Sequence, residues 1–369
     1  MADHGLKWDS LVAFDNVAAG HDGVMSDESG SLVIKPCVAA EVEFYEVSNA
    51  EHPEFAQLMP TFMGSLQRGQ SQELQNHLTT AAFHSTGNEA IVLPAALEDE
   101  SEVKDTKDLA DPSNPLRGKK LDTGLAIVLE NVLAGFKKPN FVDVKLGKRL
   151  WADDAPPAKR TKLDNVASQT TSGSLGFRIA GMKVWHPEGS GEYKVFDKFY
   201  GRNLTSVNVK DAFSTFLCLD QKTESSELLE DIISNIEEAV ESIEQIIANQ
   251  ESRMYSASLL FVYEGDPHAR KEALNSAIAQ MAQHRDSDDV LVKSQAGKRE
   301  EDEEVDEDDD DEEDEQAGPK LFDIKMIDFA HAEWTPGQGP DENMLVGIRS
   351  VRKVLKKLMK QVGHEGAEL

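Results

Sequence analysis

Residues 139–147 read Pro-Asn-Phe-Val-Asp-Val-Lys-Leu-Gly. Apolar and polar side chains alternate through this run, which predicts a strand, and side chains two residues apart on a strand share a face. We therefore expect Asp143 and Lys145 on one face. An ordinary ion pair is the simplest interpretation of such a spacing. The setting favours a binding site instead, because Gly147 permits close approach of the backbone and the next two residues are basic.

Two further charged residues stand at apolar strands. Lys35 ends the apolar run 31–35, where its ammonium could reach phosphate oxygens as the strand lysine of protein kinases does. A lysine that extends into solvent is the more common alternative. Asp328 closes an apolar strand and is followed by Phe329, as the metal-binding Asp of kinases is followed by Phe. The Gly expected next is Ala330 in this sequence. A turn or cap residue is an equally good interpretation of Asp328.

Several common sites have no match in the sequence. Neither G-x-x-x-x-G-K-[ST] nor G-x-G-x-x-G before a helix occurs, which disfavours a P-loop NTPase and a dinucleotide-binding domain. The His and Cys residues lack the spacing of a structural zinc site, and G-x-S-x-G is absent too.

Half of the net charge of -30 lies in one tract. Fifteen of the 16 residues 300–315 are acidic, and Val305 is the exception. Such a tract repels itself and offers almost nothing to bury, so we expect a disordered acidic insert at about 285–318. The remainder carries local basic clusters, and an anionic ligand is therefore compatible with the composition.

The sequence predicts neither a membrane span nor disulfides. It contains no run of about 20 apolar residues. Cys37 and Cys218 lie far apart and the N-terminus lacks the layout of a secretory signal, so we expect a reducing compartment.

Hydrophobic spacing predicts the larger elements. A long helix is expected to pack on the core with one apolar stripe, rather than to form a coiled coil, through Leu229, Ile233, Ile236, Val240, Ile243 and Ile247. A terminal amphipathic helix follows, with Leu345, Ile348, Val351, Leu355 and Leu358. Short strands are expected at 125–130, 177–179, 183–185 and 258–263.

The run Pro139-x-x-x-Asp143-x-Lys145-x-Gly147 resembles the signature of the inositol polyphosphate kinase family. Further segments resemble landmarks of this family in the expected order: Glu43-Phe-Tyr, Leu129-Glu-Asn-Val132, 174–182, 200–205, Ala257-Ser-Leu-Leu260, Ile327-Asp-Phe-Ala-His331 and 341–347. Together they cover most of the chain. Where the family has two serines, Ala257 leaves Ser258 as the single hydroxyl.

The resemblance implies a site for ATP and Mg²⁺. Lys35 would contact the ATP phosphates, and the main chain of Glu130 and Val132 would hold adenine at a hinge. Asp328 would bind Mg²⁺, with the Ser258 hydroxyl as a further ligand.

The resemblance also implies an acceptor site. Asp143 would lie where the ribose and the substrate meet. Lys145 would bind the inositol phosphates near the transferred phosphoryl group, and His331 would approach from the acceptor side. We expect Asp143, Lys145 and His331 to be the catalytic residues.

The basic residues Lys159, Arg160 and Lys162 lie in the basic run 157–164, and a short helix is expected over 158–169. Family topology favours contact with the phosphates of the substrate. A solvated basic face and a short nuclear-import signal are the alternatives, and import could use the same residues.

The implied fold is a two-lobed α+β kinase-like fold with ATP between the lobes. The N-terminal lobe would span 1–132 and end at the hinge, and the C-terminal lobe would span 133–369 with an inositol-phosphate-binding segment at 151–175. The implied reaction is ATP-dependent phosphorylation of inositol 1,4,5-trisphosphate to the tetrakis- and pentakisphosphate. The compact substrate segment favours the multikinase branch over the trisphosphate 3-kinases and the hexakisphosphate kinases.

A function of another class remains open. The acidic tract could bind transcription or chromatin proteins, which would make the chain a nuclear scaffold. We expect a monomer in the nucleus and cytoplasm that does not bind nucleic acid directly.

Overall fold

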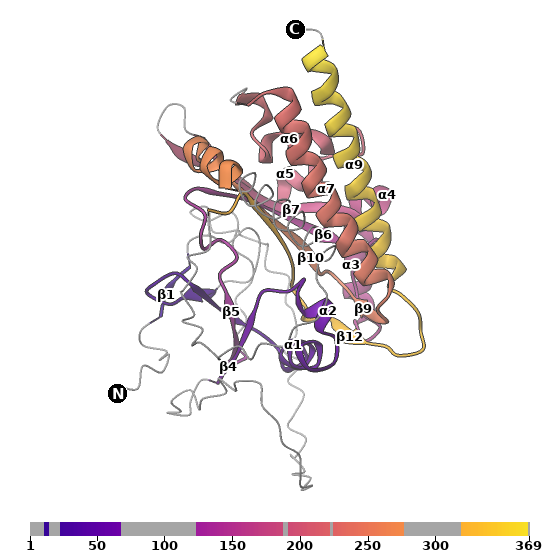
Figure 1. The fold of residues 1–369 in the computed structure, drawn as a ribbon. Helices are drawn as coiled ribbons and strands as arrows, with labels where there is room; N and C mark the ends of the chain where they lie inside the picture. Colours follow the sequence, from indigo (N-terminus) through magenta and orange to yellow (C-terminus); the bar gives the residue numbers. More distant parts are fainter. Residues whose placement is uncertain are drawn as a thin grey trace, which may run out of the picture.

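The structure is a computed structural model that describes residues 11–14, 23–67, 123–186, 191–221, 224–276 and 319–367. Two antiparallel five-stranded sheets organise these residues (Figure 1). The acidic insert expected at about 285–318 lies outside the described residues.

The first sheet carries Lys35 near its centre. Its strand order is β1 (Val12–Ala13), β2 (Met25–Ser26), β3 (Leu32–Pro36), β5 (Leu125–Glu130) and β4 (Phe62–Gln67). Strand β3 pairs with β2 on one side and β5 on the other. Two helices follow β3 in the chain, α1 (Ala39–Glu51) and α2 (Pro53–Ala56).

The second sheet carries the signature on its central strand. Its order is β11 (Phe322–Ile327), β10 (Ser258–Glu264), β6 (Pro139–Leu146), β7 (Phe177–His186) and β8 (Glu192–Phe196). A separate ribbon pairs β9 (Ser252–Met254) with β12 (Ala332–Trp334). The prediction of two short strands at 177–179 and 183–185 was wrong, because β7 is one continuous strand. Its register against β6 shifts between Asp143 and Val144, and this irregularity absorbs the apparent break in the pattern.

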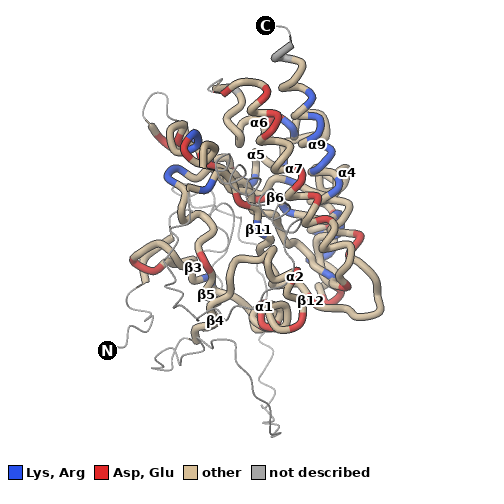
Figure 2. The backbone as a smooth tube through the Cα atoms, in the orientation of Figure 1, with Lys and Arg blue, Asp and Glu red and all other residues tan. Residues whose placement is uncertain are grey.

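Helices cover one face of the second sheet (Figure 1). They are α4 (Thr171–Leu175), α5 (Lys198–Asn203), α6 (Val209–Phe216), α7 (Ser226–Ala248) and α9 (Glu342–Ala367), and α3 (Pro157–Ser168) packs beside α4. The stripe expected on the long helix is buried, as a core-packing helix requires. Acidic residues of α7 face basic residues of α9 (Figure 2), and Arg352 of α9 bonds Glu237 and Glu244 at 2.6 and 2.7 Å.

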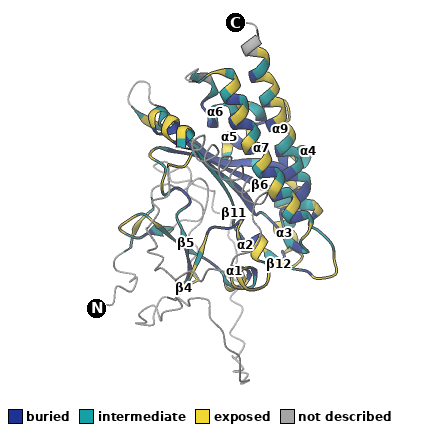
Figure 3. Ribbon diagram, in the orientation of Figure 1, coloured by how far each residue is buried: buried dark blue, intermediate teal, exposed yellow. Residues whose placement is uncertain are grey.

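One hydrophobic core runs through both parts of the molecule. Phe44 and Phe55 of the helices after β3 belong to the same buried cluster as β6, α7 and α9. The buried strands of the second sheet stand out against the exposed outer faces of the helices (Figure 3). The sheets separate in sequence between Glu130 and Pro139, but the core is continuous, so the lobe boundary at 132 stays a prediction.

In the part of the chain that the structure describes, no helix combines the length and the apolar character needed to cross a membrane.

Candidate active site

The two charged residues of the signature lie on the face of β6 that turns away from the helices. Val142, Val144 and Leu146 point into the main core. Asp143 and Lys145 occupy the alternate positions, as the period of two predicts. Asp143 is only 1% exposed, whereas Lys145 is half-buried.

The four charged residues singled out from three separate strands meet at one place. The ammonium of Lys35 lies 2.7 Å from Oδ1 of Asp328, and the ammonium of Lys145 lies 3.5 Å from Oδ2 of the same carboxylate. Lys145 also donates to the main-chain oxygen of Ser256 at 2.6 Å. Asp143 is close enough to Lys145 and Asp328 for both charges to act on its pKa.

Lys35 is not a lysine that extends into solvent. Its side chain is 14% exposed and also pairs with Glu41 of α1 at 2.9 Å. Burial opposes its charge, but the carboxylates of Asp328 and Glu41 hold the pKa of Lys35 well above its usual range. Lys35 therefore presents a permanent cation inside the cluster.

Asp328 sits at the end of β11 in the left-handed region, at φ 70°. This conformation is uncommon for a residue with a Cβ and persists only where neighbouring contacts enforce it. The next amide, that of Phe329, donates to Oε1 of Glu41 at 3.1 Å. The Phe329 ring is fully buried and stacks on Phe44 with centroids 5.0 Å apart. Glu41 and Phe44 thus hold the residue that follows the left-handed Asp328.

Asp143 has unsatisfied hydrogen-bonding capacity. Neither of its carboxylate oxygens makes a hydrogen bond of standard geometry, although the buried hydroxyl of Ser258 on the neighbouring strand lies close enough to lower the pKa of Asp143. Burial raises the pKa of Asp143 to about 6; the Lys145 charge opposes this shift and the Asp328 charge adds to it. A buried carboxylate in this state would be stabilised by an added cation.

These groups fit a divalent cation that is also bound by phosphate oxygens of a ligand. Asp143, Asp328 and Ser258 offer oxygen donors, which Mg²⁺ prefers. Among the described residues, no group of three or more His, Cys, Asp or Glu side chains forms a metal centre. An ion here would therefore need further oxygens from phosphate groups, as is usual for Mg²⁺ at nucleotides.

The strand end after Lys145 is held by the start of α9. Gly147 has φ 96°, and a Cβ there would lie 2.6 Å from the side-chain nitrogen of Asn343. Asn343 accepts bonds from the amides of Lys148 and Arg149 at 2.9 Å each, and donates to the oxygen of Arg149 at 2.9 Å. The glycine of the signature is therefore required for this close packing, and the 341–347 landmark supports the site from behind.

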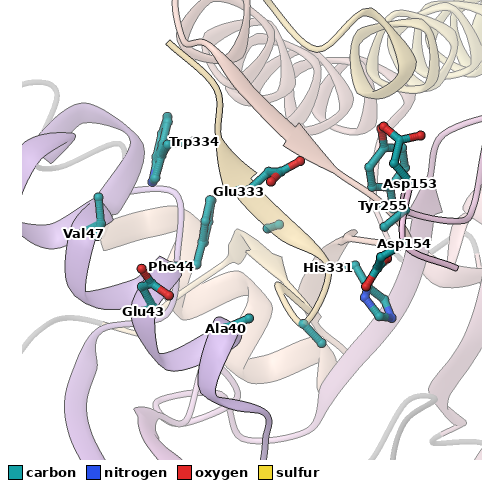
Figure 4. Close-up of a pocket in the computed structure, with 13 residues that line it drawn as sticks. Ala40, Glu43, Phe44, Val47, Asp153, Asp154, Tyr255, His331, Glu333 and Trp334 are labelled. Carbon is teal, nitrogen blue, oxygen red and sulfur yellow. The ribbon is translucent and has the colours of Figure 1, made fainter. Parts of the chain in front are cut away.

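His331, three residues after Asp328, borders a pocket of about 590 Å³ (Figure 4). Its Nε2 lies 3.3 Å from the ammonium of Lys159 on α3. Burial and the Lys159 charge lower the pKa of His331. The pocket is also lined by four carboxylates, Glu43, Asp153, Asp154 and Glu333. Phosphate groups are therefore better accommodated on the Lys145 and Lys159 side of His331 than within this acidic wall.

Similarity to known proteins identifies the family of this chain. The family model described as inositol polyphosphate kinase matches residues 126–356. The chain is 33% identical to the inositol polyphosphate multikinase of Saccharomyces cerevisiae, across 93% of this chain and 97% of that protein. The chain belongs to the inositol polyphosphate kinase family.

Two other relatives bear on the fold and on the branch of the family. A crystal structure of the inositol phosphate multikinase from S. cerevisiae, in complex with ADP and Mn²⁺, matches with a TM-score of 0.57 at 28% identity and covers 89% of this chain and 100% of that chain. The inositol hexakisphosphate kinase 3 of Mus musculus is 29% identical over 63% of this chain, but only 50% of that protein is matched. The predicted family and its two-lobed α+β kinase fold are confirmed.

The residues predicted to form the hinge of this inositol polyphosphate kinase lie at the end of the first sheet, where Glu130 is the last residue of β5 and Val132 follows it. The amide of Glu130 donates to the oxygen of Thr61 at 3.0 Å, and its carboxylate accepts from the Thr61 hydroxyl at 2.8 Å. Val132 packs in a small cluster with Leu133, Phe141 and Val262. Their contact with adenine stays a prediction.

The basic residues of 151–175 differ in their surroundings. Lys159 reaches His331, and Lys162 is exposed on α3. Arg160 instead donates to the main-chain oxygens of Asp153 and Ala155. Contact of all three with substrate stays a prediction, as do the catalytic roles of Asp143, Lys145 and His331.

The sequence analysis missed Glu41. Its carboxylate is 1% exposed and joins Lys35 to the Phe329 amide. A usable signal existed, because Glu41, Phe44, Tyr45 and Ser48 are the buried residues of α1 and lie three, four and seven positions apart. It also missed Arg178 of β7, whose charge acts on Asp143 and whose own pKa burial lowers to about 10.

Proposed function

We propose that this chain is an ATP-dependent kinase of inositol polyphosphates, with the activity of the multikinase branch. It converts inositol 1,4,5-trisphosphate to the tetrakisphosphate and then to the pentakisphosphate. The observation that carries the proposal is the meeting of Lys35, Lys145, Asp143 and Asp328 on three strands. Phosphoryl transfer depends mainly on positioning and on charge stabilisation, and this cluster supplies cations and carboxylates for both.

The residues take distinct parts in the transfer. Lys35, held by Glu41, binds phosphate oxygens of ATP from the first sheet. Lys145 lies two positions beyond the buried Asp143 on the same face of β6 and neutralises charge on the transferred phosphoryl group. His331 and Lys159 orient the acceptor from the opposite side. The main chain at Glu130 and Val132 holds the adenine.

Mg²⁺ is the proposed metal, with Asp143, Asp328 and the Ser258 hydroxyl as its protein ligands. The buried Asp143 carboxylate, which makes no hydrogen bond of standard geometry, and the nearby Ser258 hydroxyl support this assignment. The S. cerevisiae relative was crystallised with ADP and Mn²⁺. When bound, Mg²⁺ supplies positive charge to the phosphate oxygens.

The multikinase branch is favoured by the share of each relative's length that matches this chain. The multikinase of S. cerevisiae is matched over nearly its whole length, whereas half of the mouse hexakisphosphate kinase is left unmatched. The substrate segment 151–175 is compact. A trisphosphate 3-kinase or a hexakisphosphate kinase would differ in its products.

Incubation with ATP, Mg²⁺ and a panel of inositol phosphates tests the proposal, with the product isomers resolved by chromatography. The expected result is sequential conversion of the trisphosphate to tetrakis- and pentakisphosphate. Conversion of the hexakisphosphate alone would contradict the assigned branch, and no phosphorylated product from any member of the panel would contradict the function.

We further propose a separable role for the acidic tract 300–315 in binding basic transcription or chromatin proteins, with the chain in the nucleus and cytoplasm. Support comes from its charge and from the basic segment 157–164. Deletion of residues 300–315 should abolish binding to a basic partner such as a purified histone and leave inositol kinase turnover within about twofold of the intact chain. Loss of turnover would contradict the expected independence of the tract from the catalytic fold.

A further inference from the structure

Helix α3 carries basic residues assigned to the substrate but buries little of its own surface. All twelve of its residues are described, and Ala167 is the only buried one. A helix without an apolar face gains little from the hydrophobic effect when it packs. Its orientation must therefore depend on specific contacts with its neighbours.

Trp151 supplies such contacts. The guanidinium of Arg160 on α3 lies 4.7 Å from the centre of the Trp151 ring, and that of Arg149 lies 3.9 Å away. The indole N–H donates to Oδ1 of Asp164 on α3 at 2.6 Å. One side chain thus contacts α3 at two positions, through a cation–π interaction and a charge-assisted hydrogen bond.

The two arginines that flank the Trp151 ring are themselves held by hydrogen bonds. Arg149 Nε donates to the main-chain oxygen of Trp151 at 3.0 Å, and the Arg149 amide is bonded by Asn343 of α9 at 2.9 Å. On the other side, Arg160 Nε donates to the oxygen of Ala155 at 2.7 Å, which closes the turn before α3. Trp151 therefore links α3 to the signature strand and to α9.

The contact residues and the basic residues occupy different faces of α3. Arg160 and Asp164 are four positions apart, so they share a face, which Trp151 contacts. Lys159 and Lys162 are three positions apart and share another face, nearly opposite that of Arg160 and Asp164. Because each residue turns the helix by about 100°, the rotation set at Trp151 also sets the direction of Lys159, whose ammonium reaches His331 at 3.3 Å.

We propose that Trp151 is a positioning residue that fixes the rotation of α3, so that Lys159 and Lys162 face the phosphates of the acceptor. Arg160 and Asp164 act through Trp151, which assigns Arg160 to the attachment of α3. The proposal rests on the proposed function, because it gives the basic face of α3 to an inositol polyphosphate. It predicts that the contact determines the affinity for this substrate and leaves that for ATP unchanged.

Amide hydrogen exchange of the whole protein tests the attachment without requiring activity. In Trp151→Ala, exchange across residues 157–168 should rise on the order of tenfold, with α7 unchanged. Trp151→Phe keeps a ring for the cation–π contacts and loses the N–H donor, so it should fall between the wild type and Trp151→Ala. Equal α3 protection in the wild type and Trp151→Ala would overturn the proposal.

Phe199→Ala is the matched control. Phe199 is an aromatic residue, 51% exposed, whose ring lies 5.5 and 5.8 Å from the cations of Lys198 and Arg202. It resembles Trp151 in its cationic neighbours but lies on α5, which packs on β7 and β8. Its removal should leave α3 exchange unchanged, and a rise equal to that of Trp151→Ala would overturn the specific role of Trp151.

Steady-state kinetics then test the consequence for substrate. Trp151→Ala should raise KM for inositol trisphosphate by about tenfold or more and change KM for ATP by less than about twofold, with a partial effect in Trp151→Phe. An equal rise in both KM values, or none, would overturn the positioning role. A wild-type protein inactive on every inositol phosphate would overturn the proposed function and with it the substrate assignment, while the exchange result would still decide the attachment.

Discussion

Asp143 combines burial, negative charge and poorly hydrogen-bonded oxygens, a combination that is unfavourable for stability and useful for binding a cation. Its carboxylate is 1% exposed and makes no hydrogen bond of standard geometry. Active sites commonly retain such groups because the strain serves binding or catalysis. The residue should therefore reduce stability in the absence of ligands.

Replacing Asp143 with Asn should stabilise the ligand-free protein at neutral pH. The folded pKa of about 6 lies above the ordinary value of 3.8, so the native state binds more protons than the unfolded state between these values. Stability is therefore lost as pH rises through this window, and the cost at pH 7 is about 3 kcal/mol. Asn is neutral and of similar size, so thermal unfolding at pH 7 should show a Tm several degrees higher.

The pH dependence distinguishes this effect from a general gain in stability. The Tm difference between Asp143→Asn and the wild type should shrink towards pH 4, where the native carboxyl is protonated. Asp231→Asn, at an exposed position on α7, should leave Tm unchanged. A difference that stayed constant from pH 4 to pH 7 would contradict the burial argument.

Glu41 should act through geometry as well as charge. Glu41→Gln keeps an oxygen that can accept from Lys35 and from the Phe329 amide, so the fold should hold while turnover falls by about tenfold, since Lys35 loses part of its charge pairing. Glu41→Ala leaves the buried amide of Phe329 without a partner, which costs about 1–3 kcal/mol more. Turnover and urea unfolding of the two variants check this; equal stability of Gln and Ala variants would contradict it.

Sequence patterns located most of the charged cluster but not its assembly. Lys35, Asp143, Lys145 and Asp328 were each singled out from a strand pattern or from the family resemblance, and they meet in the structure. Glu41 was missed because its partner Lys35 lies on another element, and pairing between elements depends on how α1 packs. The left-handed conformation of Asp328 likewise depends on contacts between elements and has no local signal.

At the scale of elements, α9 supports the active site through a glycine. The Gly347 backbone packs against the carbonyl oxygen of Gly176, and that oxygen accepts from the amide of Gly147 at 2.7 Å. A Cβ at 347 would lie well inside van der Waals contact with this oxygen. The signature loop, α4 and α9 therefore meet at three glycines.

Gly347→Ala should cost about 1–3 kcal/mol and lower turnover, because the helix must move away from the Gly176 carbonyl. Gly363→Ala on the same helix is the matched control. The new Cβ there would meet the end of the flexible Glu230 side chain, so the variant should be neutral or gain up to about 1 kcal/mol from helix propensity. Chemical unfolding checks both, and equal effects would contradict the packing argument.

Hydrophobic spacing predicted correctly the helices whose buried face follows from burial alone. It failed for the strand whose course depends on its pairing with a neighbouring strand. The stripes of α7 and α9 are buried as their spacing predicts, because both helices pack on one core. Strand β7 was predicted as two strands, since the Ala-Gly step within it breaks the alternation. The structure accommodates that step by a register shift against β6 at Asp143, which a single-strand pattern does not contain.

At the scale of the whole molecule, the active site joins parts that share one hydrophobic core. Lys35 and Glu41 come from the first sheet and α1, whereas Asp143, Lys145 and Asp328 come from the second sheet. The amide of Met326 on β11 also donates to the oxygen of Leu58 after α2, at 2.6 Å. Placement of the cluster is therefore a property of the complete fold.

The turnover of inositol trisphosphate with ATP and Mg²⁺ by Asp328→Asn and Lys145→Ala tests this account most directly. Asp323→Asn is the control. Asp323 lies on β11, the strand that leads to Asp328, but its carboxylate pairs with Lys320 outside the charged cluster. Each cluster variant should lose at least about a hundredfold in turnover, and the control should stay within about twofold of the wild type. Near-wild-type turnover in both cluster variants would contradict the assignment of this cluster as the site of phosphoryl transfer.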